Sequence, residues 1–181
     1  MIELALHILD ISQNSLRAGA SLVEISLIED MINDRLTISI KDNGCGMNAD
    51  EIEKALDPFF TTKKVRRIGL GLPMLKQAAL QADGDFKIES EPGRGTLISA
   101  EFRHSHIDRQ PTGDVAGAII ALILERPDVD ILFTYRKNAY EYTFDTREIR
   151  ETLESVPLNN MDVIGYIRDS IKEGLSSQQD Q

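Results

Sequence analysis

Several kinds of residue and segment are scarce in this chain of 181 residues, and each scarcity excludes a class of protein. The single cysteine, Cys45, cannot form an internal disulfide, and no Cys/His spacing typical of metal sites accompanies it. The longest apolar run, "VAGAIIALIL", is far too short to span a bilayer, and the start, "MIELALHILD", lacks the positive segment of a secretion signal. These absences predict a cytoplasmic protein with no membrane segment.

Positive charge is also in short supply. Twenty Lys and Arg residues stand against 30 Asp and Glu residues, which gives a formal charge of −10. A nucleic-acid surface normally needs a basic excess, so this charge argues against DNA or RNA as a partner. Hydrophobic content of 41% and charged content of 28% fall in the ordinary range of globular proteins, so we expect a well-packed core.

The best candidate for a boundary is a polar segment that contains proline and glycine. It divides the chain into a first domain over 1–103, a linker over 104–113, an extension over 114–175 and a disordered tail over 176–181. His104 and His106 fall in the linker, and we expect both to be solvated. Whether the extension packs on the first domain is left open.

Hydrophobic periodicity divides each part into helices and strands. The first domain is predicted to contain helices over 3–18, 49–56 and 71–82 and strands over 21–29, 35–41, 85–90 and 95–102. The extension is predicted to contain a buried helix over 114–126, hairpin strands over 130–136 and 140–145, and helices over 146–154 and 160–174. The pattern predicts an α/β unit followed by a small α+β extension.

The first helix has a polar side with a mixture of chemistries. His7, Asp10, Asn14 and Arg17 follow one another at spacings of three, four and three, which places them on one helical face. The neutral amide oxygen of Asn14 suits Mg²⁺ that keeps most of its ligands from water and phosphate. Asp10 is placed to act as a base or an orienting group, and Arg17 to contact a phosphate oxygen.

The stretch "DNGCGM" (42–47) directly follows an alternating strand and holds one more glycine than a plain turn needs. Asp42, at the strand end, is able to accept a hydrogen bond from the exocyclic amine of adenine, whereas guanine would present its carbonyl oxygen. This arrangement favours ATP over GTP. We expect Gly44 and Gly46 to let the backbone adopt positive φ and approach the flat base closely.

An irregular loop over 57–69 separates two of the predicted helices. It concentrates positive charge within an acidic protein, at Lys63, Lys64, Arg66 and Arg67. Gly69 and Gly71 precede the next helix, so free backbone N–H groups and the positive end of its dipole are available to phosphates. We therefore expect the basic loop to close over a bound polyphosphate.

Five motifs occur in a fixed order: "DISQNSLRAGA", "DNGCGM", "DPFFTTK", "GLGLPM" and "EPGRGT". They resemble the N box, first glycine box, F box, second glycine box and final glycine-threonine segment of the GHKL ATPases, over residues 4 to 102. The resemblance implies a two-layer α/β sandwich, with a mixed, largely antiparallel sheet and helices on one face. It also implies that ATP and Mg²⁺ are the ligands.

The resemblance implies contacts for individual residues. Asn14 would hold Mg²⁺, Asp42 the adenine amine, and Thr96 a hydrogen bond near Asp42; Lys63 would be a lid contact. The other implied nucleotide contacts lie in the motifs, at Arg17, Gly44, Gly46, Met47, Thr62, Gly69, Leu70, Gly71 and Leu72. One position departs from the family: Asp10 stands where many members have Glu, so its carboxylate reaches about 1.5 Å less.

The motifs are most similar to those of the ATP-binding domain of sensor histidine kinases, although the N box begins too early for a phosphoacceptor helix to precede it. We therefore expect a kinase or ATPase subunit that binds ATP or ADP and acts on a separate protein, which would dock on the extension. A nucleotide-gated binding module without phosphate transfer is the alternative. A repair-type ATPase of the MutL type is a further one, since "NSLRAGA" and "DNGCGM" also resemble that branch.

Overall fold

The computed structural model describes residues 3–59 and 70–177. Its helices are α1 (Leu4–Arg17), α2 (Ala49–Leu56), α3 (Gly71–Gln81), α4 (Val115–Glu125), α5 (Thr146–Leu153) and α6 (Met161–Ser176). Its strands are β1 (Leu22–Asp30), β2 (Arg35–Asp42), β3 (Asp85–Glu91), β4 (Gly95–Arg103), β5 (Asp130–Lys137) and β6 (Tyr140–Asp145). Every helix and strand predicted from the sequence is present, with bounds that differ by two residues at most.

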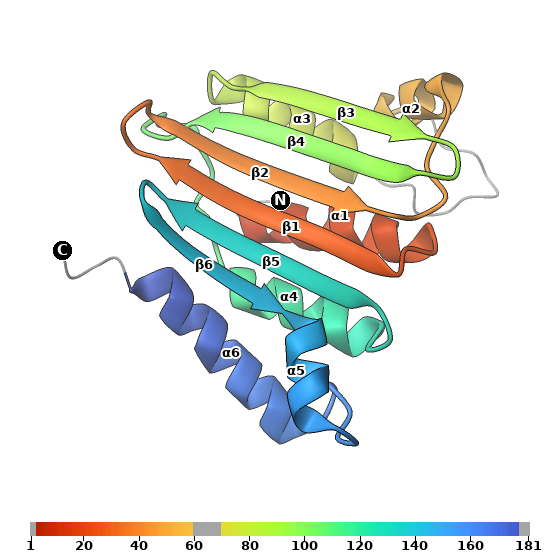
Figure 1. The fold of residues 1–181 in the computed structure, drawn as a ribbon. Helices are drawn as coiled ribbons and strands as arrows, with labels where there is room; N and C mark the ends of the chain where they lie inside the picture. Colours follow the sequence, from red (N-terminus) through yellow and green to blue (C-terminus); the bar gives the residue numbers. More distant parts are fainter. Residues whose placement is uncertain (1–2, 60–69, 178–181) are drawn as a thin grey trace.

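The strands form one twisted sheet in the order β3-β4-β2-β1-β5-β6 (Figure 1). All neighbouring strands are antiparallel except β1 and β5, which run parallel from the pair Leu22 and Asp130 onward. The predicted mixed, largely antiparallel sheet is confirmed. The hairpin β5–β6 of the extension continues the sheet of the first half rather than forming a sheet of its own.

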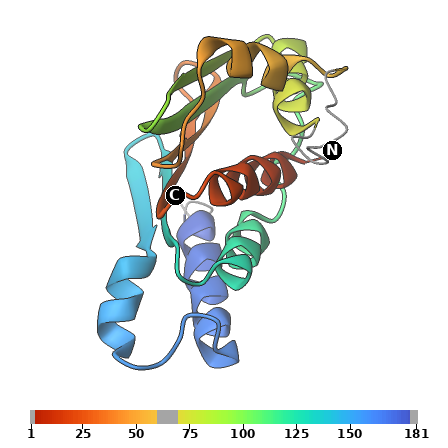
Figure 2. The same cartoon turned by 90° about the vertical axis from the view of Figure 1, so that its right-hand side faces the viewer.

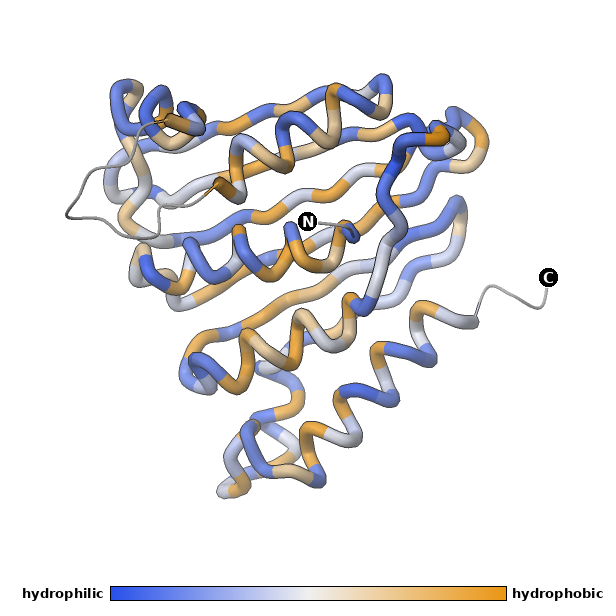
Figure 3. Tube along the Cα trace, turned by 180° about the vertical axis from the view of Figure 1, so that it is seen from behind, coloured by the Kyte–Doolittle hydropathy of each residue, from blue (hydrophilic) through white to orange (hydrophobic). Residues whose placement is uncertain are grey.

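Four helices, α1, α3, α4 and α6, lie on one face of the sheet, as the side view in Figure 2 shows. The core lies between these helices and the sheet, and the largest fully buried side chains include Ile8 and Ile11 of α1, Ile119 of α4 and Phe133 of β5. Seen from the helix side, hydrophobic and hydrophilic residues alternate along the strands, whereas most of α4 is hydrophobic (Figure 3). The buried helix predicted over 114–126 is therefore confirmed.

The segment between β4 and α4 is tied to the folded core. The backbone N–H groups of Leu4 and Ala5 donate to the carbonyls of Pro111 and Thr112 at 2.9 and 2.8 Å, so this segment caps the start of α1. The His104 ring nitrogen Nε2 lies 2.9 Å from Glu29 Oε2, and only 18% of the His104 side chain is exposed. The prediction of solvated linker histidines is wrong, because His104 lies against Glu29 of β1 and His106 lies 3.5 Å from Asp83, which follows α3.

Candidate functional site

The polar side of α1 is accessible over its second half. Asp10 and Asn14 are half-buried and Arg17 is exposed, as expected for groups that meet a ligand. Arg17 Nη1 donates to Asn14 Oδ1 at 2.9 Å, so the two side chains are already oriented toward each other. The amide oxygen of Asn14 and the carboxylate of Asp10 lie one turn apart, and such hard oxygen donors are the kind that Mg²⁺ accepts.

His7 does not belong to this accessible surface. It is 1% exposed, and its Nε2 lies 2.9 Å from Gln110 Oε1. Burial lowers the pKa of His7 below its ordinary value, although the bond to Gln110 opposes that shift. The prediction that His7 belongs to the exposed polar side of the first helix is therefore wrong, because the segment after β4 covers that turn of the helix.

Asp42 ends β2 and points toward α1, where only 8% of the residue remains exposed. Its Oδ2 accepts the Ser15 hydroxyl at 2.6 Å, and its Oδ1 accepts the Gly44 backbone N–H at 2.9 Å. Two donors on different oxygens fix the plane of the carboxylate, and each oxygen keeps a lone pair for a further donor. The carboxylate is thus oriented to accept a hydrogen bond from an amine.

A second hydroxyl network supports the loop from the opposite side. Thr96 of β4 stands directly across from Asp42 in the sheet, and its hydroxyl lies 2.8 Å from Ser90 Oγ. Ser90 Oγ also accepts the Met47 N–H at 2.8 Å and lies 2.9 Å from the Gly95 carbonyl. Ser90 therefore joins the loop to β4. Neither Ser90 nor Ser15 is among the site residues predicted from the sequence. The signal for Ser15 was a hydroxyl on an otherwise apolar helical stripe.

Gly44 and Gly46 are needed for packing within the protein, which was not predicted from the sequence. Gly46 has φ of +67°, and a Cβ there would overlap the Glu91 carbonyl. At Gly44 a Cβ would lie 2.9 Å from the Ala18 carbonyl oxygen, beside the bond from the Cys45 N–H to that oxygen. Only Gly46 has positive φ, and both glycines allow close approach within the protein itself.

The start of α3 meets α1 at Gly71. A Cβ on Gly71 would overlap the Asp10 carboxylate, so the missing side chain is what lets these two elements approach. Leu70 is exposed at the N-cap, whereas Leu72 lies in the core at 5% exposure and leaves only its backbone for a ligand. The first turn thus directs backbone N–H groups and the positive helix end toward the side of α1 that carries Asp10.

The structure thus contains three contacts between motifs: Asp42 with Ser15 of α1, Met47 with Ser90 beside Thr96, and Asp10 of α1 with Gly71 of α3. Three predicted residues, Thr62, Lys63 and Gly69, lie outside the described residues. Within residues 3–59 and 70–177, no group of three His, Cys, Asp or Glu side chains gathers with the geometry of a metal site. The same part of the chain contains no helix long and apolar enough to cross a membrane.

Comparison with known families shows the family of this chain. Residues 2–106 match the family described as the histidine kinase-, DNA gyrase B- and HSP90-like ATPase. The chain belongs to this ATPase family. The match covers α1 to β4, which are the elements that carry the three contacts, and the predicted membership of the GHKL superfamily is confirmed.

The curated relatives that match this chain include bacterial kinases. Sporulation kinase E of Bacillus subtilis is 39% identical over 71 residues, or 39% of this chain and 10% of that protein. Sensor kinase CckA of Brucella abortus is 42% identical over 66 residues, or 36% of this chain and 7% of that protein. The chain thus spans about a tenth of the length of these relatives, and the similarity supports an ATP-binding domain of the histidine-kinase-like type.

Among solved structures, one titled "Crystal Structure of N terminal domain of a DNA repair protein" matches with a TM-score of 0.53 at 12% identity. The alignment covers 79% of this chain and 52% of that one. At this identity the likeness shows the fold alone.

Proposed function

We propose that this protein binds Mg-ATP and acts as a kinase or ATPase subunit on a separate protein. The observation that carries the proposal is the joint orientation of Asp42 by Ser15 on α1 and by the Gly44 N–H. A carboxylate that receives two donors at the end of a strand is suited to accept the amine of adenine and to reject guanine. The kinase names of the curated relatives support phosphoryl transfer as the reaction.

The remaining roles follow from the geometry of α1 and α3. Asn14 would hold Mg²⁺, and Arg17, at 2.9 Å from the same amide oxygen, would contact a phosphate oxygen. Asp10 would orient the attacking group, because Gly71 lets its carboxylate lie against the first turn of α3. Mg²⁺ would supply neutralisation of the phosphate charge, and Lys63 would add a contact from the basic loop.

A nucleotide-gated binding module is a second candidate, and one packing relationship favours it. Helix α4 of the extension packs against α1, and Gln13 Nε2 donates to Glu125 Oε2 at 2.7 Å between them. A shift of α1 on nucleotide binding would therefore reach the extension directly. In this alternative, ATP changes the affinity for a partner on the extension and no phosphate is transferred.

Labelled ATP separates the two candidates. The purified chain, with Mg²⁺ and candidate partner proteins, should transfer label to the partner or release phosphate if it is a kinase or ATPase. The Asp10→Asn variant should keep ATP affinity and slow either reaction by roughly 10²-fold or more, the scale of a positioned acid–base group. Nucleotide-dependent partner binding with no turnover in the wild type would favour the gated module.

The chain itself should not become the phosphoacceptor at histidine. His7 is 1% exposed, and His104 is held against Glu29 at 2.9 Å, so neither ring is free to reach a γ-phosphate. Acid-labile, base-stable label on the purified chain that disappears in a His104→Ala, His106→Ala double variant would overturn the partner-directed role.

A further inference from the structure

Asp42 and its neighbour Asn43, at the end of β2, contact different parts of the protein. Asp42 is the last residue of β2 and contacts Ser15 of α1, whereas Asn43, the next residue, contacts the segment that leads into β1. Asn43 Oδ1 accepts the backbone N–H groups of Ser21 and Leu22 at 2.9 and 3.0 Å. Its Nδ2 donates to Ser21 Oγ at 2.8 Å. Asn43 therefore uses its whole amide group to hold the base loop, residues 42–47, against the first residues of β1.

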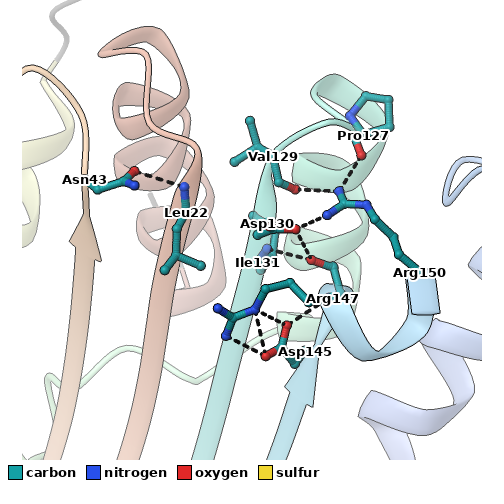
Figure 4. A network of polar contacts seen from close by, with 10 residues as sticks. Leu22, Asn43, Pro127, Val129, Asp130, Ile131, Asp145, Arg147 and Arg150 are labelled. Atoms are coloured by element: carbon teal, nitrogen blue, oxygen red, sulfur yellow. Dashed lines mark hydrogen bonds and ion pairs between the residues drawn. The ribbon is translucent and has the colours of Figure 1, made fainter. Parts of the chain in front are cut away.

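The contact continues from β1 into the extension. The Ser21 carbonyl accepts the Asp130 N–H at 2.9 Å, where β5 begins beside β1. Asp130 Oδ1 pairs with Arg150 Nη1 of α5, and Arg150 Nη2 donates to the carbonyls of Pro127 and Val129 at 2.6 and 3.1 Å. Figure 4 shows Arg150 converging on these three acceptors in the same view as Asn43 and Leu22.

Arg150 bonds three groups of the short segment 127–130. The side chains of Arg150 and Asp130 are 33% and 29% exposed, so the pair is partly shielded from solvent. Thr146, at the start of α5, adds a bond in which its buried hydroxyl accepts the Ile131 N–H at 2.9 Å. Thr146 is the one fully buried residue of α5, and Ile149 and Leu153 pack partly buried against the core, so these polar contacts act together with apolar packing to hold α5 at the sheet end.

We propose that Arg150 and Asp130 are positioning residues for the nucleotide site, acting on the base loop through Ser21 and Asn43. The proposal rests on ATP being the ligand of Asp42. Without the guanidinium of Arg150, segment 127–130 becomes more mobile. The bond from the Asp130 N–H to the Ser21 carbonyl then weakens, and the bonds between Ser21 and the Asn43 amide weaken with it. The Asp42 carboxylate on the same loop loses its orientation in turn. The extension thereby sets nucleotide affinity without touching the nucleotide.

Arg150→Ala tests the proposal, with Arg147→Ala as its matched control. Arg147 lies on the same helix, and its guanidinium bonds Asp145 at 2.7 Å rather than Asp130 and the carbonyls of Pro127 and Val129. Arg150→Ala should weaken ATP affinity roughly 3- to 30-fold by calorimetry, whereas Arg147→Ala should leave it unchanged. Arg150→Lys keeps the charge beside Asp130 but loses the planar fork, and it should give an intermediate loss while retaining the fold.

A double-variant cycle separates coupling from general loosening. Asn43→Ala should weaken ATP affinity, and adding Arg150→Ala should cause little further loss, since both act on one chain of contacts. Additive losses, or equal affinities in Arg150→Ala and Arg147→Ala, would overturn the proposal.

Amide hydrogen exchange tests the same coupling without nucleotide. Peptides over 18–23 and 42–47 should exchange several-fold faster in Arg150→Ala and Arg150→Lys than in Arg147→Ala. If the wild type fails to bind ATP, the proposed function is wrong, yet faster exchange would still support the coupling. Unchanged exchange in both Arg150 variants would overturn it.

Discussion

The carboxylate of Asp10 lies in the space that a side chain on Gly71 would fill. This contact joins the N box to the second glycine box, two motifs about 60 positions apart in the sequence. Asp10 has a short side chain, and the absence of a side chain at position 71 lets its carboxylate lie against the first turn of α3. The two positions therefore form one unit, and each should be sensitive to changes in the other.

Gly71→Ala should slow turnover about as much as Asp10→Asn, roughly 10²-fold, because the new methyl group displaces the carboxylate. Only the far end of a side chain must move, so the free energy of unfolding should change by less than about 1 kcal/mol. The double variant should be no slower than Asp10→Asn alone. Steady-state rates and thermal unfolding measure both effects.

Two other glycines control this experiment. A Cβ on Gly165 of α6 meets nothing within 4 Å, so Gly165→Ala should stabilise the protein by about 0.5–1 kcal/mol through helix propensity. At Gly84 a Cβ would overlap the Glu101 backbone carbonyl, so Gly84→Ala should destabilise the fold. Full turnover in Gly71→Ala would show that Asp10 has no catalytic role.

Ser15→Ala should weaken ATP binding by about 1 kcal/mol, since the Asp42 carboxylate loses the donor that orients it. Asp42→Asn should cost about 1–3 kcal/mol, because the amide places a donor opposite the adenine amine. Ser12 provides the control: it is equally buried on α1, and its hydroxyl has no hydrogen-bond partner among residues 3–59 and 70–177. Ser12→Ala should leave ATP affinity intact. Unchanged ATP affinity of Asp42→Asn in calorimetry would contradict the base-reading role of Asp42, and equal affinities of Ser15→Ala and Ser12→Ala would show that Ser15 does not orient it.

Asn14→Ala should damage Mg²⁺-dependent ATP binding more than Mg²⁺-free ADP binding, because the lost oxygen serves the metal rather than the base. Gln13→Ala is the control, because it removes a neighbouring amide that bonds Glu125 rather than the candidate site. This variant should bind Mg-ATP and Mg²⁺-free ADP with the same affinities as the wild type. Titrations with and without Mg²⁺ measure the effect. Equal losses for ATP and ADP would argue against metal binding by Asn14.

His7→Gln should make the protein less sensitive to mild acid. Burial lowers the pKa of His7 below 6.5 in the folded protein, so the unfolded chain takes up a proton first as the pH falls. The wild type should therefore lose free energy of unfolding as the pH falls through about 6.5 toward the folded pKa. Glutamine keeps an amide donor for Gln110 without titrating. Parallel pH profiles of unfolding for both proteins would show that burial of His7 does not control acid stability.

The order of helices and strands was predictable because each element has a clear period and a clear stop. The capping box of Asn48 and Glu51 starts α2 at the predicted residue, since both reciprocal bonds form locally. The place of Asp42 at the end of β2 was also predictable, because the alternating pattern of the strand stops there and glycines follow.

The partners of these residues were not predictable, because they depend on register between distant segments. Ser15 reaches Asp42 across 27 positions, and Ser90 reaches Met47 across 43. His7 looked polar from its helix alone, and only the returning segment near Gln110 buries it. Gly44 and Gly46 were predicted to allow a close approach to a bound base. In the structure, the groups that they approach closely are protein carbonyls.

The parallel pairing of β1 with β5 has a consequence for any shortened form of this protein. β1 is an interior strand here, and its Val23, Ile25 and Leu27 are buried. Removing everything after β4 would leave its backbone N–H and C=O groups unpaired along one whole side, next to an uncovered apolar surface. A fragment cut at the family boundary would therefore tend to associate through β1 with other chains. For this protein, the extent of the family match is a poor guide to where the chain can be divided.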